Sequence, residues 1–102
     1  MKPQRIQLSR KKGFDLQTFS RELNGLPAKK IDRMTAFGNP FPFESRGKTW
    51  AFKQHRRWIW FKAQRALRAK IRAELYGYNL ACWCRLDECC HGITLLDISN
   101  SS

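Results

Sequence analysis

All four cysteines of this chain lie between residues 82 and 91, together with one of its two histidines. Cys82 and Cys84 lie within a short apolar stretch, residues 78–84, and Cys89 and Cys90 follow it. Such a run is typical of a largely buried strand, in which successive side chains point to opposite faces of the sheet. We therefore expect the thiols of Cys82 and Cys84 to share one face and Trp83 to occupy the other.

A second apolar stretch, residues 93–98, is predicted to form a short helix that packs back onto the sheet. Cys90 and His91 would lie in its first turn, where free backbone N–H groups carry a partial positive charge. This charge attracts anions and favours the thiolate form of a nearby cysteine. The first turn is therefore a candidate position for a phosphate group or a reactive sulfur.

Three interpretations of the cysteines compete. As a metal site, Cys82, Cys84, Cys90 and His91 offer the thiolate and imidazole ligands that zinc prefers, although their spacing differs from the usual Cys-x2-Cys knuckle. As a catalytic pair, Cys90 would be the nucleophile, with His91 or His55 as its base, in acyl or glycosyl transfer. As structural residues, Cys82 and Cys84 would be small buried hydrophobes and Cys90 would cap a helix. Zinc is the cofactor that the residue types suggest.

The chain carries 20 Lys and Arg residues against 8 Asp and Glu, a formal net charge of +12. Such an excess predicts a polyanionic partner, either nucleic acid or a nucleotide. Ten of the cations and none of the acids fall between residues 45 and 73. A host protein with an acidic groove is the alternative partner for this basic stretch.

Residues 49–75 contain neither proline nor glycine and are predicted to form one long helix or two consecutive ones. Apolar side chains recur every four residues from Ile59 to Leu75, which predicts one packed stripe. Cations interleaved with aromatic residues suit nucleic acid, because guanidinium groups bind phosphates and rings stack on bases. The candidate phosphate-binding residues are Lys53, Arg56, Arg57, Lys62, Arg65, Arg68 and Arg72. The alternative is that the aromatic rings simply fill the core.

The remaining patterns complete the predicted fold. Residues 5–10 and 29–33 are predicted to be strands, and residues 14–26 a helix that stops at Asn24 and Gly25. Together these elements predict a small α/β fold with a parallel or mixed sheet of three to four strands, one long or broken basic helix and a short C-terminal helix. We expect one domain over residues 1–98 and a frayed tail over residues 99–102.

Residues 38–41, Gly-Asn-Pro-Phe, form a turn by composition, and we expect this turn to expose the amide of Asn39 beside Arg33. The turn follows the second predicted strand and the cysteines follow the third. In a parallel sheet both segments lie at the carboxyl edge, where such sheets bind ligands. The order of elements thus predicts a nucleotide-like pocket lined by Arg10, Arg33, Gly38, Asn39, Pro40, Phe41, Cys82, Cys84, Cys90 and His91.

Three motifs occur in order along nearly the whole chain: RIQLSRKKG at residues 5–13, IDRMTAFGNPF at residues 31–41, and the cysteine run. Together they resemble a little-characterised family of small phage, prophage and bacterial proteins of unknown function. The family pattern has a tryptophan where this chain has Phe37 and an aspartate where it has Ile93, and Cys89 is not part of the pattern. The resemblance implies a fold and a site rather than a reaction.

No apolar run reaches the roughly 18 residues needed to span a membrane, and the N-terminus lacks the apolar stretch of a secretory signal. We therefore expect a cytoplasmic protein with reduced thiols, in the host cytoplasm if it is phage-encoded. The favoured hypothesis is a small basic accessory protein that binds nucleic acid or a nucleotide. The alternatives are an inhibitor or modulator of a host protein and an enzyme that processes nucleosides or nucleotides through Cys90 and His91.

Overall fold

A computed structural model describes residues 2–32, 35–41, 46–87 and 90–100 of the chain. Within these residues, three short parallel strands form one sheet in the order β1-β3-β2. The strands are β1 (Arg5–Gln7), β2 (Ala28–Lys30) and β3 (Asn79–Cys82). The helices are α1 (Leu16–Asn24), α2 (Lys48–Ile59), α3 (Arg65–Leu75) and α4 (His91–Ser99). This arrangement confirms the predicted small α/β fold.

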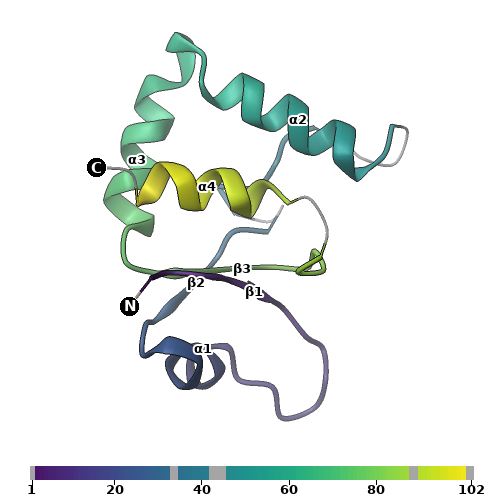
Figure 1. The fold of residues 1–102 in the computed structure, drawn as a ribbon, viewed down its shortest axis with the longest axis vertical. Helices are drawn as coiled ribbons and strands as arrows, with labels where there is room; N and C mark the ends of the chain where they lie inside the picture. Colours follow the sequence, from purple (N-terminus) through teal and green to yellow (C-terminus); the bar gives the residue numbers. More distant parts are fainter. Residues whose placement is uncertain (1, 33–34, 42–45, 88–89, 101–102) are drawn as a thin grey trace.

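The sheet separates α1 from the other three helices (Figure 1). Helix α4 lies close above the sheet and contacts β3, and both α2 and α3 pack against α4. The long basic segment is therefore on the same side of the sheet as the C-terminal helix. Among the described residues, no helix combines the length and the apolar character needed to cross a lipid bilayer.

Strand β3 is the central strand, and all four of its residues are buried. It pairs in parallel with both neighbours, and the pairing continues just beyond them. The N–H of Leu8 donates to the carbonyl of Cys82, and the N–H of Ile31 donates to the carbonyl of Ala81, each at 2.8 Å. A strand enclosed on both faces explains the continuous apolar run in the sequence. The regular ladder ends at Cys82, two residues before the predicted end of this strand.

Helix α1 begins and ends at local signals in the sequence. The side chain of Asp15 accepts a hydrogen bond from the N–H of Thr18 at 3.1 Å and so caps the first turn. Gly25 adopts a left-handed conformation (φ 79°), and its N–H donates to the carbonyl of Arg21. The helix therefore ends at Asn24 and Gly25, as predicted.

The predicted helix over the basic stretch is in fact two helices joined by a 3-10 turn, η1 (Lys62–Gln64). Phe61 has an extended backbone (φ −66°, ψ 152°), so helical geometry stops there without glycine or proline. Nη1 of Arg68 donates to the carbonyls of Ile59 (2.8 Å) and Phe61 (2.7 Å). A side chain of α3 thus binds the end of α2. Ala63, part of the predicted apolar stripe, is exposed at this corner.

Two clusters of buried side chains form the core. The larger one lies between the sheet and helices α3 and α4 and contains Ile31, Phe37, Ile59, Ile71, Leu75, Leu80, Cys82, Cys90, Leu95 and Ile98. The smaller one lies toward α1 and contains Ile6, Leu8, Ala28 and Ala81. Two of the cysteines therefore belong to the larger core. Helix α4 includes Ser99, which is buried and lies one residue beyond the predicted end of the domain.

A buried polar pair joins α1 to the sheet. The side-chain amides of Asn79 and Asn24 exchange two hydrogen bonds, at 2.8 and 2.9 Å. Asn79 also donates to the hydroxyl of Ser20 and accepts from the backbone N–H of Gln4. These contacts satisfy the buried Asn79 amide, and they link β3 to segments that are far apart in the chain. The sequence patterns did not predict this network.

Candidate metal centre and adjoining basic helices

The sulfur atoms of Cys82, Cys84 and Cys90 all lie within 4.8 Å of one another. Cys82 ends β3, Cys84 follows it by two residues, and Cys90 is the N-cap of α4. The sulfurs of Cys82 and Cys90 are 3.1 Å apart and buried, and all three residues are free cysteines. The prediction that Cys82 and Cys84 point the same way is confirmed. Three thiols this close together can hold a metal ion.

His91 is buried and begins α4. Its Nε2 lies 2.6 Å from the backbone carbonyl oxygen of Ile31, just after β2. Because a carbonyl oxygen can only accept, Nε2 must carry the proton, and Nδ1 then has a free lone pair. Nδ1 lies 3.6 Å from the sulfur of Cys90. A carbonyl that orients the far nitrogen in this way is typical of metal-ligating histidines.

The pKa values of the Cys82 and Cys90 thiols are shifted in opposite directions. Hydrogen bonds from Cys82, and then from Cys84, hold the pKa of the Cys90 thiol well below its usual range, against the opposing effect of burial. The hydrogen bonds with Cys84 and Cys90, together with burial, raise the pKa of the Cys82 thiol. The N–H of Gly92 also donates to the Cys90 sulfur, at 3.4 Å. Cys90 is therefore the sulfur that ionises first, at the start of α4.

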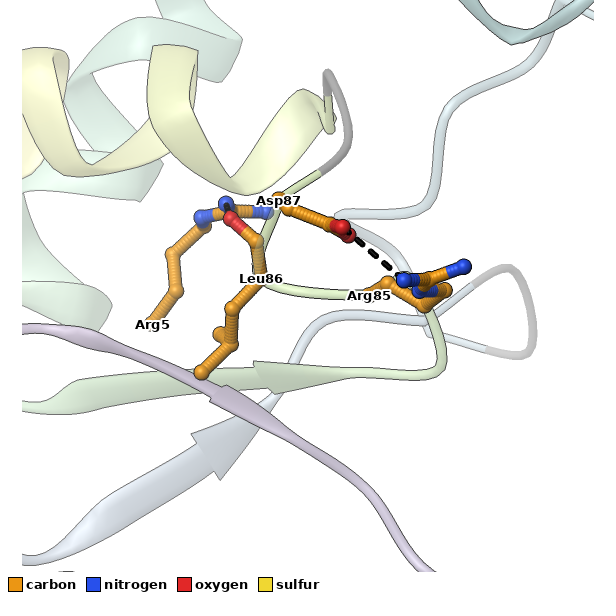
Figure 2. Close-up of polar contacts among 4 residues, drawn as sticks. All are labelled: Arg5, Arg85, Leu86 and Asp87. Carbon is orange, nitrogen blue, oxygen red and sulfur yellow. Dashed lines mark hydrogen bonds and ion pairs between the residues drawn. The ribbon is translucent and has the colours of Figure 1, made fainter.

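Arg5 anchors the connection between β3 and α4 (Figure 2). Its Nη2 donates to the carbonyl of Leu86 at 2.7 Å, so β1 is tied to the loop that separates Cys84 from Cys90. On either side of Leu86 in this loop, Arg85 and Asp87 form an exposed ion pair at 2.9 Å. Sequence analysis placed Arg5 only in a strand motif and missed this contact, which helps to position the sulfur cluster.

The side chain of Asn39 is directed into the protein rather than toward solvent. It is 7% exposed, and its Nδ2 donates to the carbonyl of Ala51 in α2 at 3.1 Å. Its Oδ1 accepts from the N–H of Phe41 at 2.9 Å. The prediction that the turn exposes this amide for a base or sugar is therefore wrong, because the amide holds the turn against α2. Phe41 packs edge-on against Trp58.

A cavity of about 150 Å³ lies between this turn and helices α2, α3 and α4. Its lining residues are Ala36, Phe37, Gly38, Pro40, His55, Trp58, Ile59, Leu67, Ile71 and Leu95. The ring of His55 packs edge-on against that of His91, with centroids 5.7 Å apart. His55, which lines the cavity, thus contacts His91, whereas none of Cys82, Cys84, Cys90 and His91 is among the lining residues. The pocket shared by the turn and the cysteines stays a prediction.

The predicted pocket residues are divided between several places. Gly38 and Pro40 line the cavity, whereas Cys82, Cys84, Cys90 and His91 form the sulfur cluster. Arg10 instead lies 4.3 Å from the centroid of the exposed Trp83 ring, whose indole N–H donates to Asp32 at 3.2 Å. Arg33 lies outside the described residues.

The candidate phosphate-binding residues lie on α2, η1 and α3, and five of them are exposed without an ion-pair partner among the residues that the structure describes. These five, which we call the basic face, are Lys53, Arg57, Lys62, Arg65 and Arg72. Arg56 forms an exposed ion pair with Asp97 at 3.3 Å. Arg68 uses its guanidinium group for the two carbonyls at the end of α2. It is therefore a structural residue of the corner.

The aromatic residues of this segment also divide into two groups. Trp58 is half-buried and packs against Phe41 and His55. Trp60 and Phe61, at the corner between α2 and α3, are 46% and 55% exposed. The interpretation of these rings as core residues thus holds for Trp58, and the corner keeps two rings accessible.

Comparison with known proteins adds one finding. The chain matches no curated protein and no solved structure. A family match covers residues 6–101, which include most of β1, all later elements and the whole sulfur cluster. The fold and the cluster described above are therefore features of the matched region, and this chain belongs to the family described as a domain of unknown function, DUF4326.

Proposed function

We propose that this protein binds nucleic acid through the basic face, as a small accessory protein. The observation that carries the proposal is that five exposed cations without ion-pair partners in the described residues lie within a stretch free of acids. Such a concentration of charge attracts phosphates and releases their counterions. The exposed rings of Trp60 and Phe61 at the same corner support single-stranded nucleic acid, because stacking needs unpaired bases.

Salt dependence tests this proposal directly. If all five cations contact phosphates of a single strand, the logarithm of the affinity should fall with the logarithm of salt concentration with a slope of about −3.5. Fluorescence anisotropy with a labelled oligonucleotide measures this slope. An affinity that is unchanged between low and moderate salt would exclude phosphate contacts.

A pair of variants localises the contacts. The triple variant Lys62→Gln, Arg65→Gln, Arg72→Gln should make the slope shallower by about two. The matched control, Lys11→Gln, Lys12→Gln, Arg21→Gln, removes the same charge near α1, on the other side of the sheet, and should keep the slope. Capture of a host protein that persists after nuclease treatment and depends on the same triple would instead support the acidic-groove alternative.

We further propose that the sulfur cluster holds zinc, with Nδ1 of His91 as the fourth ligand. Three soft sulfur donors within 4.8 Å and an oriented imidazole support this assignment. A closed set of four protein ligands is typical of structural zinc sites rather than catalytic ones. Free cysteines, which can serve as metal ligands, persist in a reducing compartment, and this fits the proposed cytoplasmic location.

Elemental analysis of the purified protein tests the zinc proposal. We expect one zinc ion per chain in the wild type and loss of that ion in Cys84→Ser and in His91→Ala. Cys89→Ser makes the same chemical change outside the proposed ligand set and should retain the metal. Wild-type protein purified under reducing conditions without a stoichiometric metal would contradict the assignment.

The contact between Cys90 and His91 supports the alternative that the protein is an enzyme, because a thiol beside an imidazole can act as a nucleophile with its base. Cys90 is only 2% exposed, so a substrate would need to reach it through the protein surface. This alternative predicts that Cys90→Ala abolishes turnover of a nucleoside or nucleotide while the domain stays folded. Turnover that survives this substitution would exclude it.

A further inference from the structure

The side chains that line the cavity beneath the basic helices are mostly apolar. Apart from the rings of His55 and Trp58, its described lining consists of aliphatic residues, Phe37, Gly38 and Pro40. Its volume of about 150 Å³ matches that of an apolar protein cavity known to take a benzene ring. One six-membered ring therefore fits this space.

His55 is one of the residues that line the cavity, and it has an unused hydrogen-bonding atom. The residue is 1% exposed, and its Nδ1 has no hydrogen-bond partner in the part of the chain that the structure describes. A neutral imidazole offers one donor and one acceptor, so the unpaired Nδ1 can bind a ligand group of either kind. Buried polar atoms are normally satisfied, so the unpaired nitrogen points to a missing partner.

Water that enters from the surface would pair with the imidazole but would leave the apolar side chains of the wall without a packing partner. A planar ring with one polar edge satisfies both the apolar wall and the imidazole. Ala36 and Pro40 are exposed, so the wall of the cavity reaches the protein surface. Nζ of Lys70 lies 5.8 Å from the centroid of the Phe37 ring and 4.0 Å from the carboxylate of Glu74, so a cation that a phosphate must share with this exposed ion pair lies beside the cavity.

We propose that the cavity accepts a single pyrimidine base extruded from a nucleic acid strand that is bound on the basic face. This inference rests on the proposed function and names the chemical class that the protein recognises. The face of the base packs on the apolar wall, its polar edge pairs with His55, and Lys70 meets the neighbouring phosphate. Helices α2 and α3 carry the basic face on their exposed side and much of the cavity wall on their buried side, so the proposal requires the strand to pass from these helices to the exposed turn residues Ala36 and Pro40.

Two oligomers of equal length test the inference, a short oligothymidylate and one with the same backbone but abasic sites. The comparison uses a Trp60→Ala, Phe61→Ala background, which removes the exposed stacking rings, and we expect this protein to bind the oligothymidylate roughly tenfold more tightly, the difference that one well-packed base contributes. In the same background, Leu67→Phe, which fills the cavity, and His55→Phe, which removes the polar atom but keeps a ring, should each abolish this difference. Both variants should keep the salt dependence of the background protein.

Leu23→Phe is the matched control, because it makes the same change as Leu67→Phe on an exposed position of α1. It should keep the tenfold difference. If the Trp60→Ala, Phe61→Ala protein binds both oligomers equally, or if His55→Phe retains full discrimination, the base pocket is wrong while nucleic acid binding stands. If the wild type binds neither oligomer at low salt, the proposed function itself fails. Circular dichroism of each variant confirms that it is folded.

Discussion

Buried polar residues make the most specific contacts of this protein. Asn79 pairs with Asn24, and His91 binds the carbonyl of Ile31, and in each case the partner is more than fifty positions away in the sequence. Hydrogen bonds of this kind add little net stability when made, but a buried group that loses its partner is costly. At the scale of single residues, these contacts therefore decide which segments lie side by side.

Replacement of Asn79 by leucine should destabilise the protein by about 2–4 kcal/mol, because the buried groups that it satisfies would lose their partner. Urea denaturation measures this change. Gln7→Leu, a similar substitution on an exposed position of β1, is the control and should cost far less. Equal losses in the two variants would show that the Asn79 network contributes nothing special.

His55 makes stability depend on pH. Burial, followed by the neighbouring His91, lowers its pKa from 6.5 to about 4, with Cys90 acting in the opposite sense. Between these two pKa values, the His55 side chain therefore binds a proton in the unfolded chain but not in the folded one. The contribution of His55 to the free energy of unfolding is present above pH 6.5. It should fall by up to about 3 kcal/mol as the pH drops toward 4.

Urea unfolding at a series of pH values, with a chelator present throughout, tests this expectation. His55→Phe should remove the part of the decline that belongs to His55 and leave the rest of the pH profile as in the wild type. Parallel pH profiles for the two proteins would show that His55 is protonated at its ordinary pKa.

At the scale of the elements, the corner between α2 and α3 is held by one side chain. The sequence over this corner contains neither proline nor glycine, so a continuous helix was a valid local expectation. The break at Phe61 exists because Arg68 binds the freed carbonyls and Ile59 and Ile71 are both buried in the same core. Tertiary packing thus overrides helix propensity here.

Arg68→Lys should loosen this corner by about 1–2 kcal/mol, because a lysine lacks the guanidinium fork although its charge is the same. Arg72→Lys, one turn further along α3 on the basic face, is the control and should be close to neutral. Thermal unfolding of both variants measures the difference. A corner that tolerates Arg68→Lys as well as Arg72→Lys would mean that packing alone holds it.

At the scale of the whole molecule, the sulfur cluster joins elements that the sheet alone does not hold together. It connects the end of β3 to the start of α4, and through His91 to the residue after β2. With only three short strands, the sheet leaves much of the cohesion to such contacts. Metal at this site would therefore stabilise the protein as a unit.

If the cluster holds zinc as proposed, removal of the ion by a strong chelator under reducing conditions should lower the melting temperature clearly, because the binding free energy of a structural metal is part of the folding free energy. Addition of zinc should restore it, and Cys84→Ser should show neither response. A melting temperature that is indifferent to chelator and zinc in the wild type would mean that the cluster contributes as thiols only.

Local rules in the sequence determined the parts of this protein that depend on neighbouring residues. The apolar run of β3, the cap at Asp15 and the stop at Gly25 all follow from side-chain type and backbone preference. Only the tertiary structure decided the break at Phe61, the inward turn of the Asn39 amide, the pairing of Asn79 and the cavity beside His55. The physical reason is that each of these features depends on a partner that folding brings near. The local sequence shows that a polar group needs a partner when it is buried, but it does not show which residue that partner is.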